Sequence, residues 1–226
     1  MRSDLAIIIP ALNEAATIGS IVASLTGTGH VIVVDDGSSD RTGDIARAQG
    51  ASVVTHAVNR GYDGALNSGF ARAAELDCAY AITLDADGQH PAEKIGEFVG
   101  ALDQGADLVL GVRDRMQRFG ESAFAILTRA RFGIGDPLCG MKGYRMALYH
   151  SRGHFDSYGS IGTELMLFAA ANGAKIVQIP LESRERAGAP RFDRLLRANL
   201  RILCAAFIGM TRFGVGRRVA RGAAGW

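Results

Sequence analysis

The first 110 residues alternate between short apolar runs and longer segments in which apolar residues recur at helical spacing. Residues 5–9, 31–34 and 79–84 are almost continuously apolar, which is typical of strands covered on both faces of a sheet. Segments 13–25 and 63–75 repeat small or apolar residues along one stripe, as a packed helix does. Strands that alternate with helices in this way predict an α/β fold with a mainly parallel central sheet flanked by helices.

Polar residues follow three of these runs, at the point where each strand is expected to end. Residues 10–14 read P-A-L-N-E, Asp35 and Asp36 close the second run, and Asp85 and Asp87 follow the third. The carboxyl ends of parallel strands meet at one edge of a sheet, where such folds bind ligands. A dinucleotide site of the dehydrogenase type is excluded, because it needs G-x-G-x-x-G after the first strand. We therefore expect one polar site built from several strand ends.

Asp85 and Asp87 are spaced so that both carboxylates point the same way from an extended segment. Two carboxylates held close together repel each other unless a cation lies between them, and their oxygens suit Mg²⁺ or Mn²⁺. Gly88 lets the backbone approach a ligand, and Gln89 adds an amide oxygen. Taken alone, the D-x-D pattern favours a solvated acidic turn that caps a helix starting at Pro91. The rest of the chain must decide between these two interpretations.

Beyond residue 113 the pattern loosens and ends in a basic helix. Residues 122–132 and 162–171 predict helices, 175–181 an edge strand, and 136–143 a turn-rich segment. From residue 192 to 213, large apolar residues recur at three- and four-residue steps, and Arg194, Arg197 and Arg201 share another face. This helix either packs on the domain or on a second copy, or lies as a basic amphipathic helix in a membrane interface.

Composition is that of a globular protein, with 226 residues of which 48% are hydrophobic and 21% charged. Cys78, Cys139 and Cys204 are odd in number and far apart, so neither a disulfide framework nor a zinc site is indicated. No apolar run is long enough to cross a bilayer. The net charge of +2 hides an asymmetry, since residues 184–226 carry ten arginines against two acidic residues. We expect a cytoplasmic protein whose tail allows peripheral contact with the inner face of the plasma membrane.

Four motifs, taken in order, resemble the donor half of family 2 glycosyltransferases, which have the GT-A fold. They are IIIPALNEA from residue 7, VVDDGSSDRT from residue 33, NRGYDGALNSGF from residue 59 and LDADGQH from residue 84. The chain is most similar to the branch of dolichol-phosphate mannose synthases and polyprenyl-phosphate glycosyltransferases, over about residues 5 to 191. The resemblance favours a ligand role for the D-x-D pattern. It implies a catalytic domain of residues 1–191, and the charge and apolar spacing beyond it lead us to expect a basic amphipathic helical tail of residues 192–226.

The resemblance also implies a role for individual residues of the donor site. Those expected to hold the base and ribose of the nucleotide are Pro10, Leu12, Glu14, Val34 and Asp36. Those expected to hold the metal and the donor diphosphate are Asp85, Ala86, Asp87 and Gln89. Within this second group Asp85, Asp87 and Gln89 are the candidate metal ligands for Mg²⁺ or Mn²⁺, with Asp87 and Gln89 expected to bind directly.

Further basic and acidic residues are matched outside that group. Arg113 corresponds to a basic residue near the donor or acceptor phosphate. Arg186 and Arg191 lie in a segment similar to an R-x-G-x-S-K loop that closes over diphosphate, although Pro190 stands in place of the serine and Arg191 in place of the lysine. Glu164 stands where related enzymes often carry an acidic residue near the acceptor, and a role at the N-terminus of its own helix is equally compatible.

These expectations combine into an inverting, metal-dependent glycosyltransferase with Asp87 and Glu164 as candidate catalytic residues. The donor would be a UDP- or GDP-sugar and the acceptor a polyprenyl phosphate at the membrane surface, with no nucleic acid involved. One alternative keeps the fold and transfers the sugar to a soluble or cell-envelope saccharide, with Glu164 as the base. Another is a non-catalytic module that binds a nucleotide sugar. A receiver-like signalling domain fits poorly, because its acidic pair follows the first strand and not the second.

Overall fold

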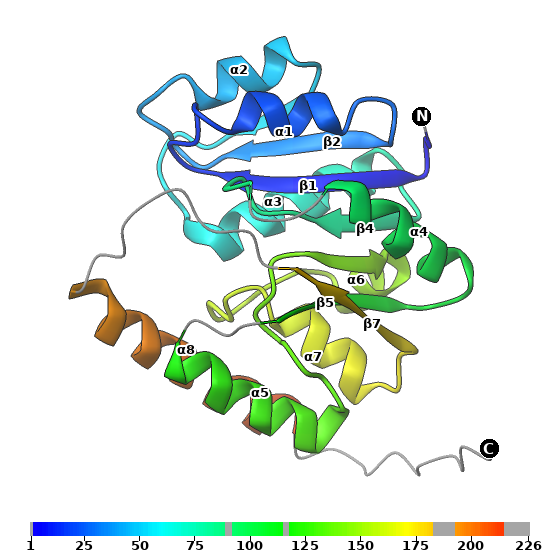
Figure 1. The fold of residues 1–226 in the computed structure, drawn as a ribbon, viewed down its shortest axis with the longest axis vertical. Helices are drawn as coiled ribbons and strands as arrows, with labels where there is room; N and C mark the ends of the chain where they lie inside the picture. The colour runs from blue at the N-terminus through cyan, green and yellow to red at the C-terminus, as the bar shows by residue number, and fades with distance from the viewer. Residues whose placement is uncertain (1, 89–91, 115–117, 183–192, 215–226) are drawn as a thin grey trace.

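A seven-stranded sheet forms the centre of the molecule, in the order β3-β2-β1-β4-β6-β5-β7. The computed structural model describes residues 2–88, 92–114, 118–182 and 193–214. The strands are β1 (Leu5–Ala11), β2 (His30–Asp35), β3 (Ser52–Thr55), β4 (Tyr80–Thr83), β5 (Leu108–Arg113), β6 (Lys142–Arg145) and β7 (Ile176–Leu181). Neighbouring strands are parallel except where β6 pairs with β4 and β5. The sheet is mainly parallel, as expected, and its parallel strands end on one side of the molecule (Figure 1).

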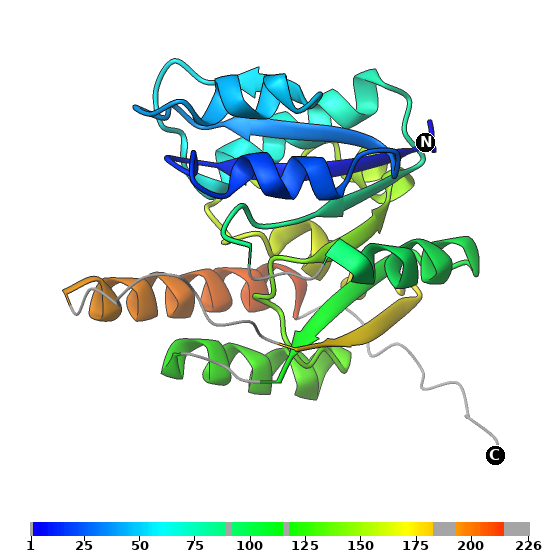
Figure 2. The same cartoon turned by 45° about the horizontal axis from the view of Figure 1, so that its top comes forward.

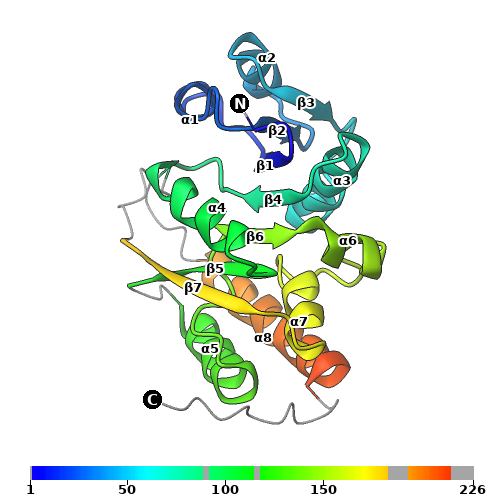
Figure 3. The same cartoon turned by 90° about the vertical axis from the view of Figure 1, so that its right-hand side faces the viewer.

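Helices cover both faces of this sheet, which produces three layers (Figure 3). One face carries α1 (Ile18–Ser24), α2 (Thr42–Ala48) and α4 (Ile95–Asp103), the last preceded by a 3₁₀ turn at Ala92–Lys94. The other face carries α3 (Gly61–Glu75), α5 (Phe119–Phe132), α6 (Met146–Arg152), α7 (Glu164–Ala171) and α8 (Asp193–Phe213). The α/β class and the flanking helices predicted from the sequence are confirmed.

The strands with continuous apolar runs are covered on both faces of the sheet, as inferred, because successive strand residues point to opposite faces and both are buried. In β1, Ile7 and Ile9 join the core cluster that includes Ile18 of α1 and Phe98 of α4. Ile8 joins the other cluster, with residues of α3 and α7. Both faces of β1 are therefore buried, and polar residues appear only after the strand ends.

The first helix starts later than the sequence indicated. The sequence pattern placed a helical segment at residues 13–25, but α1 begins at Ile18, and Asn13 has a left-handed backbone with φ of +57°. Its side-chain oxygen accepts a hydrogen bond from the backbone N–H of Ser39 at 2.8 Å. The backbone N–H of Asn13 in turn donates to the Ser38 hydroxyl at 3.0 Å. Asn13 therefore ties the loop after β1 to the loop after β2, instead of capping a helix.

A strand begins in the last two residues of the segment predicted to be turn-rich, 136–143, and continues to Arg145. β6 starts at Lys142 and runs antiparallel between β4 and β5, and α6 follows it directly. Its sequence, Lys-Gly-Tyr-Arg, lacks the apolar run that identified the other strands, so no strand was predicted there. Lys142, Gly143 and Tyr144 are nevertheless buried, because both flanking strands cover their backbone.

The C-terminal helix packs against the domain and lies parallel to α5 (Figure 2). Its buried stripe includes Ile202, Ala205 and Ala206, so one of the two arrangements considered for this helix, packing on the domain, is present. The proposed boundary at residue 191 lies outside the described residues. No helix among the described residues combines the length and apolar character needed to span a bilayer.

Candidate active site

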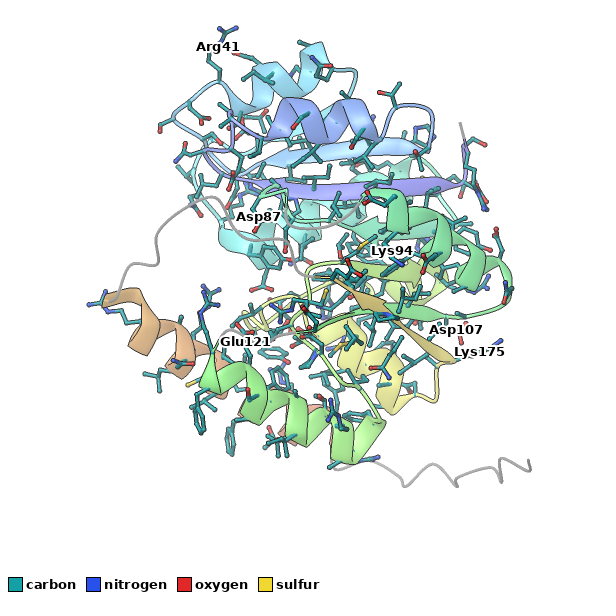
Figure 4. The ribbon with its side chains drawn as sticks, viewed as in Figure 1. Arg41, Asp87, Lys94, Asp107, Glu121 and Lys175 are labelled. Atoms are coloured by element: carbon teal, nitrogen blue, oxygen red, sulfur yellow. The ribbon has the colours of Figure 1, made fainter. Side chains whose placement is uncertain are left out.

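A pocket of about 370 Å³ lies at the edge where β1, β2 and β4 end, next to the first turn of α3. Figure 4 places Asp87 on this side of the molecule, and Asp107 and Lys175, which precede β5 and β7, on the opposite side. The residues named from the sequence that line the pocket are Pro10, Leu12, Glu14, Asp36, Asp85, Ala86 and Asp87. The expectation that polar residues after separate strands converge is therefore confirmed. Their contacts with a ligand remain predictions.

Asp36 holds the loop that leads into α3. Its Oδ1 accepts hydrogen bonds from the backbone N–H of Arg60 at 2.8 Å and from His56 Nδ1 at 2.6 Å, and its Oδ2 accepts from the backbone N–H of Gly61 at 2.8 Å. The other ring nitrogen of His56, Nε2, is hydrogen-bonded to the Ser68 hydroxyl at 2.8 Å. Asp36 is almost fully buried. Its carboxylate therefore lines the pocket and also holds the loop that forms part of the same lining.

Asp85 lines the pocket, and its carboxylate has little free space around it. The Tyr62 hydroxyl donates to Asp85 Oδ1 at 3.2 Å. Burial, and then the neighbouring Asp85 charge, raise the pKa of Tyr62 well above its usual value, so the hydroxyl stays a donor. On its other side, the Asp85 carboxylate lies against the Cα of Gly140, where a side chain would collide with it. Gly140 is thus the residue that makes room for Asp85.

A buried lysine stabilises the backbone next to Tyr62. The Lys142 ammonium donates to the carbonyl of Gly162 at 2.9 Å, and the N–H of Gly162 donates to Asp63 at 2.6 Å. Burial lowers the pKa of Lys142, while Cys139 and the carboxylates of Asp136 and Asp85 oppose that shift. Gly162 is held through both backbone groups, so the segment that supports the Tyr62 ring is fixed.

The two carboxylates suit a divalent cation held jointly with a diphosphate. Mg²⁺ is commonly bound by one or two carboxylates, with substrate phosphates and water completing its shell. Asp85 and Asp87 line the same pocket, which meets that requirement. The described residues contain no cluster of three or more histidine, cysteine, aspartate or glutamate side chains that forms a complete protein-only site. Gln89, the third expected ligand, lies outside the described residues.

Arg113 is engaged by acidic side chains away from the pocket lining. Its guanidinium donates to Asp136 through Nε at 2.7 Å and through Nη2 at 3.0 Å, and lies 3.3 Å from Glu121. Burial would lower the pKa of Arg113, but Asp136 and Glu121 raise it overall. Burial would raise the pKa of Asp136, but Arg113 lowers it overall. The structure shows a structural ion pair here, and Arg186 and Arg191 lie outside the described residues.

Glu164 is not brought to the pocket. It is fully buried in the first turn of α7, and its carboxylate pairs with Arg152 and lies 3.2 Å from His154 Nε2. The backbone N–H of Ser157 donates to it at 2.6 Å. Burial would raise the pKa of Glu164, but the hydrogen bonds from Arg152, Ser157 and His154 lower it overall. These contacts are those of a structural carboxylate. They are compatible with the alternative considered from the sequence, in which Glu164 stabilises the N-terminus of its own helix.

Val34 also differs from the other predicted donor residues. Its side chain is fully buried in the core cluster that contains Ile8 and Phe70. It packs on the face of the sheet covered by α3, and not among the residues that line the pocket. The apolar run 31–34, which ends at Val34, made this burial predictable, because every residue of such a run is expected to face a covered side of the sheet.

Sequence reasoning missed a group of pocket residues that comes from one motif. They are Asn59, Gly61, Tyr62 and Ala65. All lie in the stretch NRGYDGALNSGF, which supported the resemblance without any role being given to its members. Its polar and glycine-rich start, directly before a predicted helix, was the available signal. The structure shows that this start lines the pocket together with residues at the ends of β1 and β4.

Comparison with known proteins agrees with this geometry. The chain is 33% identical over 204 residues to a dolichyl-phosphate hexose transferase of Haloferax volcanii, covering 84% of this chain and 87% of that protein. It is 28% identical to an undecaprenyl-phosphate 4-deoxy-4-formamido-L-arabinose transferase of an Enterobacter species, covering 80% of this chain and 59% of that protein.

Solved structures of glycosyltransferases are also similar to this chain. A glucosyl-3-phosphoglycerate synthase of Mycobacterium tuberculosis, crystallised with Mn²⁺, uridine diphosphate and glucosyl-3-phosphoglycerate, superimposes with a TM-score of 0.72 at 27% identity. The match covers 97% of this chain and 82% of that one. The sequence pattern of the family described as "Glycosyl transferase family 2" matches residues 6–153. This chain belongs to glycosyl transferase family 2 and is a glycosyltransferase.

Proposed function

We propose that this enzyme is an inverting, metal-dependent transferase that moves a sugar from a UDP- or GDP-sugar to a polyprenyl phosphate at a membrane surface. The observation that carries the proposal is the convergence of Asp85 and Asp87 with Glu14 and Asp36 in one pocket. The names of the Haloferax and Enterobacter relatives support a polyprenyl-phosphate acceptor. The Mycobacterium structures with Mn²⁺ or Mg²⁺ and uridine diphosphate support a divalent ion and a nucleotide donor.

In this proposal each wall of the pocket has a separate task. Pro10, Leu12 and Glu14 hold the base and ribose, and the loop fixed by Asp36 closes the opposite side. Asp85 and Asp87 hold the cation, and Tyr62 keeps the Asp85 carboxylate in place through its hydrogen bond. The bound cation neutralises the charge that develops on the leaving diphosphate. The chain itself therefore contributes positioning and charge, with no covalent intermediate.

The state of Glu164 favours a phosphate acceptor over an alcohol. An alcohol must lose a proton to a base as it attacks, whereas a phosphate oxygen is already nucleophilic and needs only to be positioned. Glu164 is fully buried, has a lowered pKa and is held by Arg152, His154 and Ser157. A carboxylate in that condition is a poor general base. Saccharide transfer with Glu164 as the base is therefore the weaker alternative.

Transfer can be tested with the full-length protein. We expect radiolabelled sugar to move from a UDP- or GDP-sugar to polyprenyl phosphate in the presence of Mn²⁺, and not to oligosaccharide acceptors. Asp87→Ala should abolish transfer without changing the thermal unfolding temperature. Asp44→Ala is the matched control, since Asp44 is an exposed aspartate on α2. Nucleotide-sugar binding without any turnover would instead identify a non-catalytic binding module, and transfer to saccharide alone would contradict the acceptor.

A further inference from the structure

Two neighbouring helices present large apolar side chains to solvent. The exposed fractions of these side chains range from 39% to 77%, and the residues are Phe119, Ile126 and Leu127 on α5 and Leu200, Leu203 and Phe207 on α8. Exposed apolar residues scattered singly are ordinary, but a contiguous group marks an interaction site. Only the C-terminal helix was singled out in the sequence, so the apolar surface of α5 is a new finding.

The exposed residues form matching stripes on the two helices. On α5, Phe119 and Ile126 belong to a stripe with Ala123 and Ala130, at steps of four, three and four residues. On α8, Leu200, Cys204, Phe207 and Thr211 follow the same steps, and all four are exposed. Residues at these steps lie on one face of a helix. Each helix therefore has one face against the domain and a largely apolar face toward solvent.

Contacts between the helices join the two stripes into one surface. The backbone N–H of Gly120 donates to the Asn199 side chain at 2.9 Å. Near the other end, Arg131 donates to the carbonyl of Gly214 at 2.9 Å, so the helices run in the same direction, as Figure 2 shows. Leu127 lies seven residues after Gly120, and Leu203 four after Asn199, so both lie on the flanks where the helices meet.

The charges around this apolar face have one sign. Arg129, Arg197, Arg201 and Arg212 are exposed. The single acidic residue of α5, Glu121, is buried and pairs with Arg113 and Arg118. Among the described side chains of the two helices there is no exposed carboxylate. The sequence after α8 adds three more arginines in its last twelve residues.

We propose that the joined face of α5 and α8 docks on an anionic lipid surface, with its apolar residues in the headgroup region and its arginines against lipid phosphates. The proposal rests on the proposed function, since a polyprenyl-phosphate acceptor is held in a membrane. An apolar face bordered by cations is the pattern of helices that lie in a membrane interface. A second copy of the chain is a poorer occupant, because two such faces would bring like charges together.

The proposed orientation brings the donor pocket close to the lipid. Arg201 lies on the flank of α8 away from α5, with its guanidinium 3.6 Å from Asp63. Asp63 follows Tyr62, which lines the pocket and bonds Asp85. A path from the apolar face therefore passes the arginine flank and reaches the donor pocket at Tyr62. Docking through this face places a lipid-borne phosphate near the side of the pocket that Tyr62 lines.

Vesicle flotation tests the docking surface without any catalytic step. The full-length protein is mixed with vesicles of phosphatidylcholine alone or with added phosphatidylglycerol. We expect it to float with the anionic vesicles, less so at high salt. The double substitution Ile126→Ser and Phe207→Ser should weaken binding by about tenfold or more. Val58→Ser is the control, because Val58 is 67% exposed and lies outside the face; it should float as the wild type does. Thermal unfolding and binding of uridine diphosphate with Mn²⁺ verify that the double variant is folded.

Three results would overturn the docking proposal. The first is wild-type protein that floats with neither kind of vesicle, and the second is a double variant that floats as well as the wild type. The third is light scattering that shows a dimer for the wild type and a monomer for the double variant. Transfer to polyprenyl phosphate in detergent micelles separates this failure from that of the proposed function. Docking that fails while micellar transfer persists refutes the surface alone. Docking that holds while transfer to polyprenyl phosphate is absent refutes the proposed acceptor.

Discussion

Gly140→Ala is the most informative single substitution for the donor site. A methyl group at this position would lie 2.5 Å or less from both carboxylate oxygens of Asp85, whereas real Cβ contacts are essentially never shorter than 3.0 Å. Gly140 has no positive φ, so alanine is compatible with its backbone and the effect is steric. The carboxylate must therefore move, and its hydrogen bond to Tyr62 must stretch or break.

The size of the effect follows from that displacement. Overpacking a close-packed site costs about 1–3 kcal/mol of unfolding free energy. A misplacement on the order of 1 Å at a reacting centre costs about 100-fold in rate. We expect Gly140→Ala to remain folded with a modestly lower unfolding temperature, to bind uridine diphosphate with Mn²⁺ more weakly, and to lose about 100-fold in kcat/KM.

Calorimetric titration, steady-state transfer and thermal unfolding measure the three quantities. Gly100→Ala is the matched control, because Gly100 lies inside α4 with nothing within 4 Å of the added methyl group. That control should be neutral or stabilising by up to about 1 kcal/mol, with unchanged transfer. If Gly140→Ala binds nucleotide and transfers sugar as the wild type does, Asp85 does not act in the donor site.

Other predictions concern the ion pair, the loop before α3 and the metal. Arg113→Gln should lower the unfolding free energy by about 3 kcal/mol, measured in urea, because it leaves the buried Asp136 carboxylate unpaired; an unchanged value would refute the structural role. The pKa of Asp136 is lowered, so the unfolded chain binds more protons there and this stability is lost as pH falls below the usual value near 3.9. The unfolding temperature of the wild type should therefore fall more steeply in that acid range than the unfolding temperature of Arg113→Gln. Parallel plots of unfolding temperature against pH would refute the stabilisation of the Asp136 carboxylate by Arg113. Asp36→Asn should cost about 1–3 kcal/mol, because its amide cannot accept all three donors, and should weaken nucleotide binding in titrations; unchanged affinity would separate the loop from the site. Excess EDTA should abolish transfer and added Mn²⁺ restore it, whereas turnover in EDTA would refute the metal.

The edge that carries the pocket was predictable because burial leaves a direct mark on the sequence. Strands covered on both faces are apolar throughout, so polar residues appear only where β1, β2 and β4 emerge from the core. Parallel strands emerge on one side, which made the convergence of Glu14, Asp36 and Asp85 predictable without coordinates. The same reasoning applied strictly would have removed Val34 from the donor site, since Val34 still belongs to the apolar run 31–34 and the polar residues begin only at Asp35.

The features that were missed depend on contacts between distant segments. β6 is buried by its neighbours and has no apolar pattern of its own. The position of the Asp85 carboxylate depends on the absence of a side chain at Gly140, which is 55 positions away along the chain. Arg113 and Glu164 were matched by position, but Asp136 and Arg152 engage them, and a motif does not reveal such partners. The apolar face of α5 became visible only when the structure showed that no described element covers it.

The proposed transfer requires that a cation held by Asp85 and Asp87 binds the diphosphate of a nucleotide sugar. Calorimetric titration of uridine and guanosine diphosphate into the wild type and Asp87→Ala, each with and without Mn²⁺, measures whether it does. We predict that one nucleotide binds to the wild type only with Mn²⁺, and that Asp87→Ala loses this binding at an unchanged unfolding temperature. Equal affinity in the variant, or binding that does not need the metal, would show that Asp85 and Asp87 do not hold such a cation.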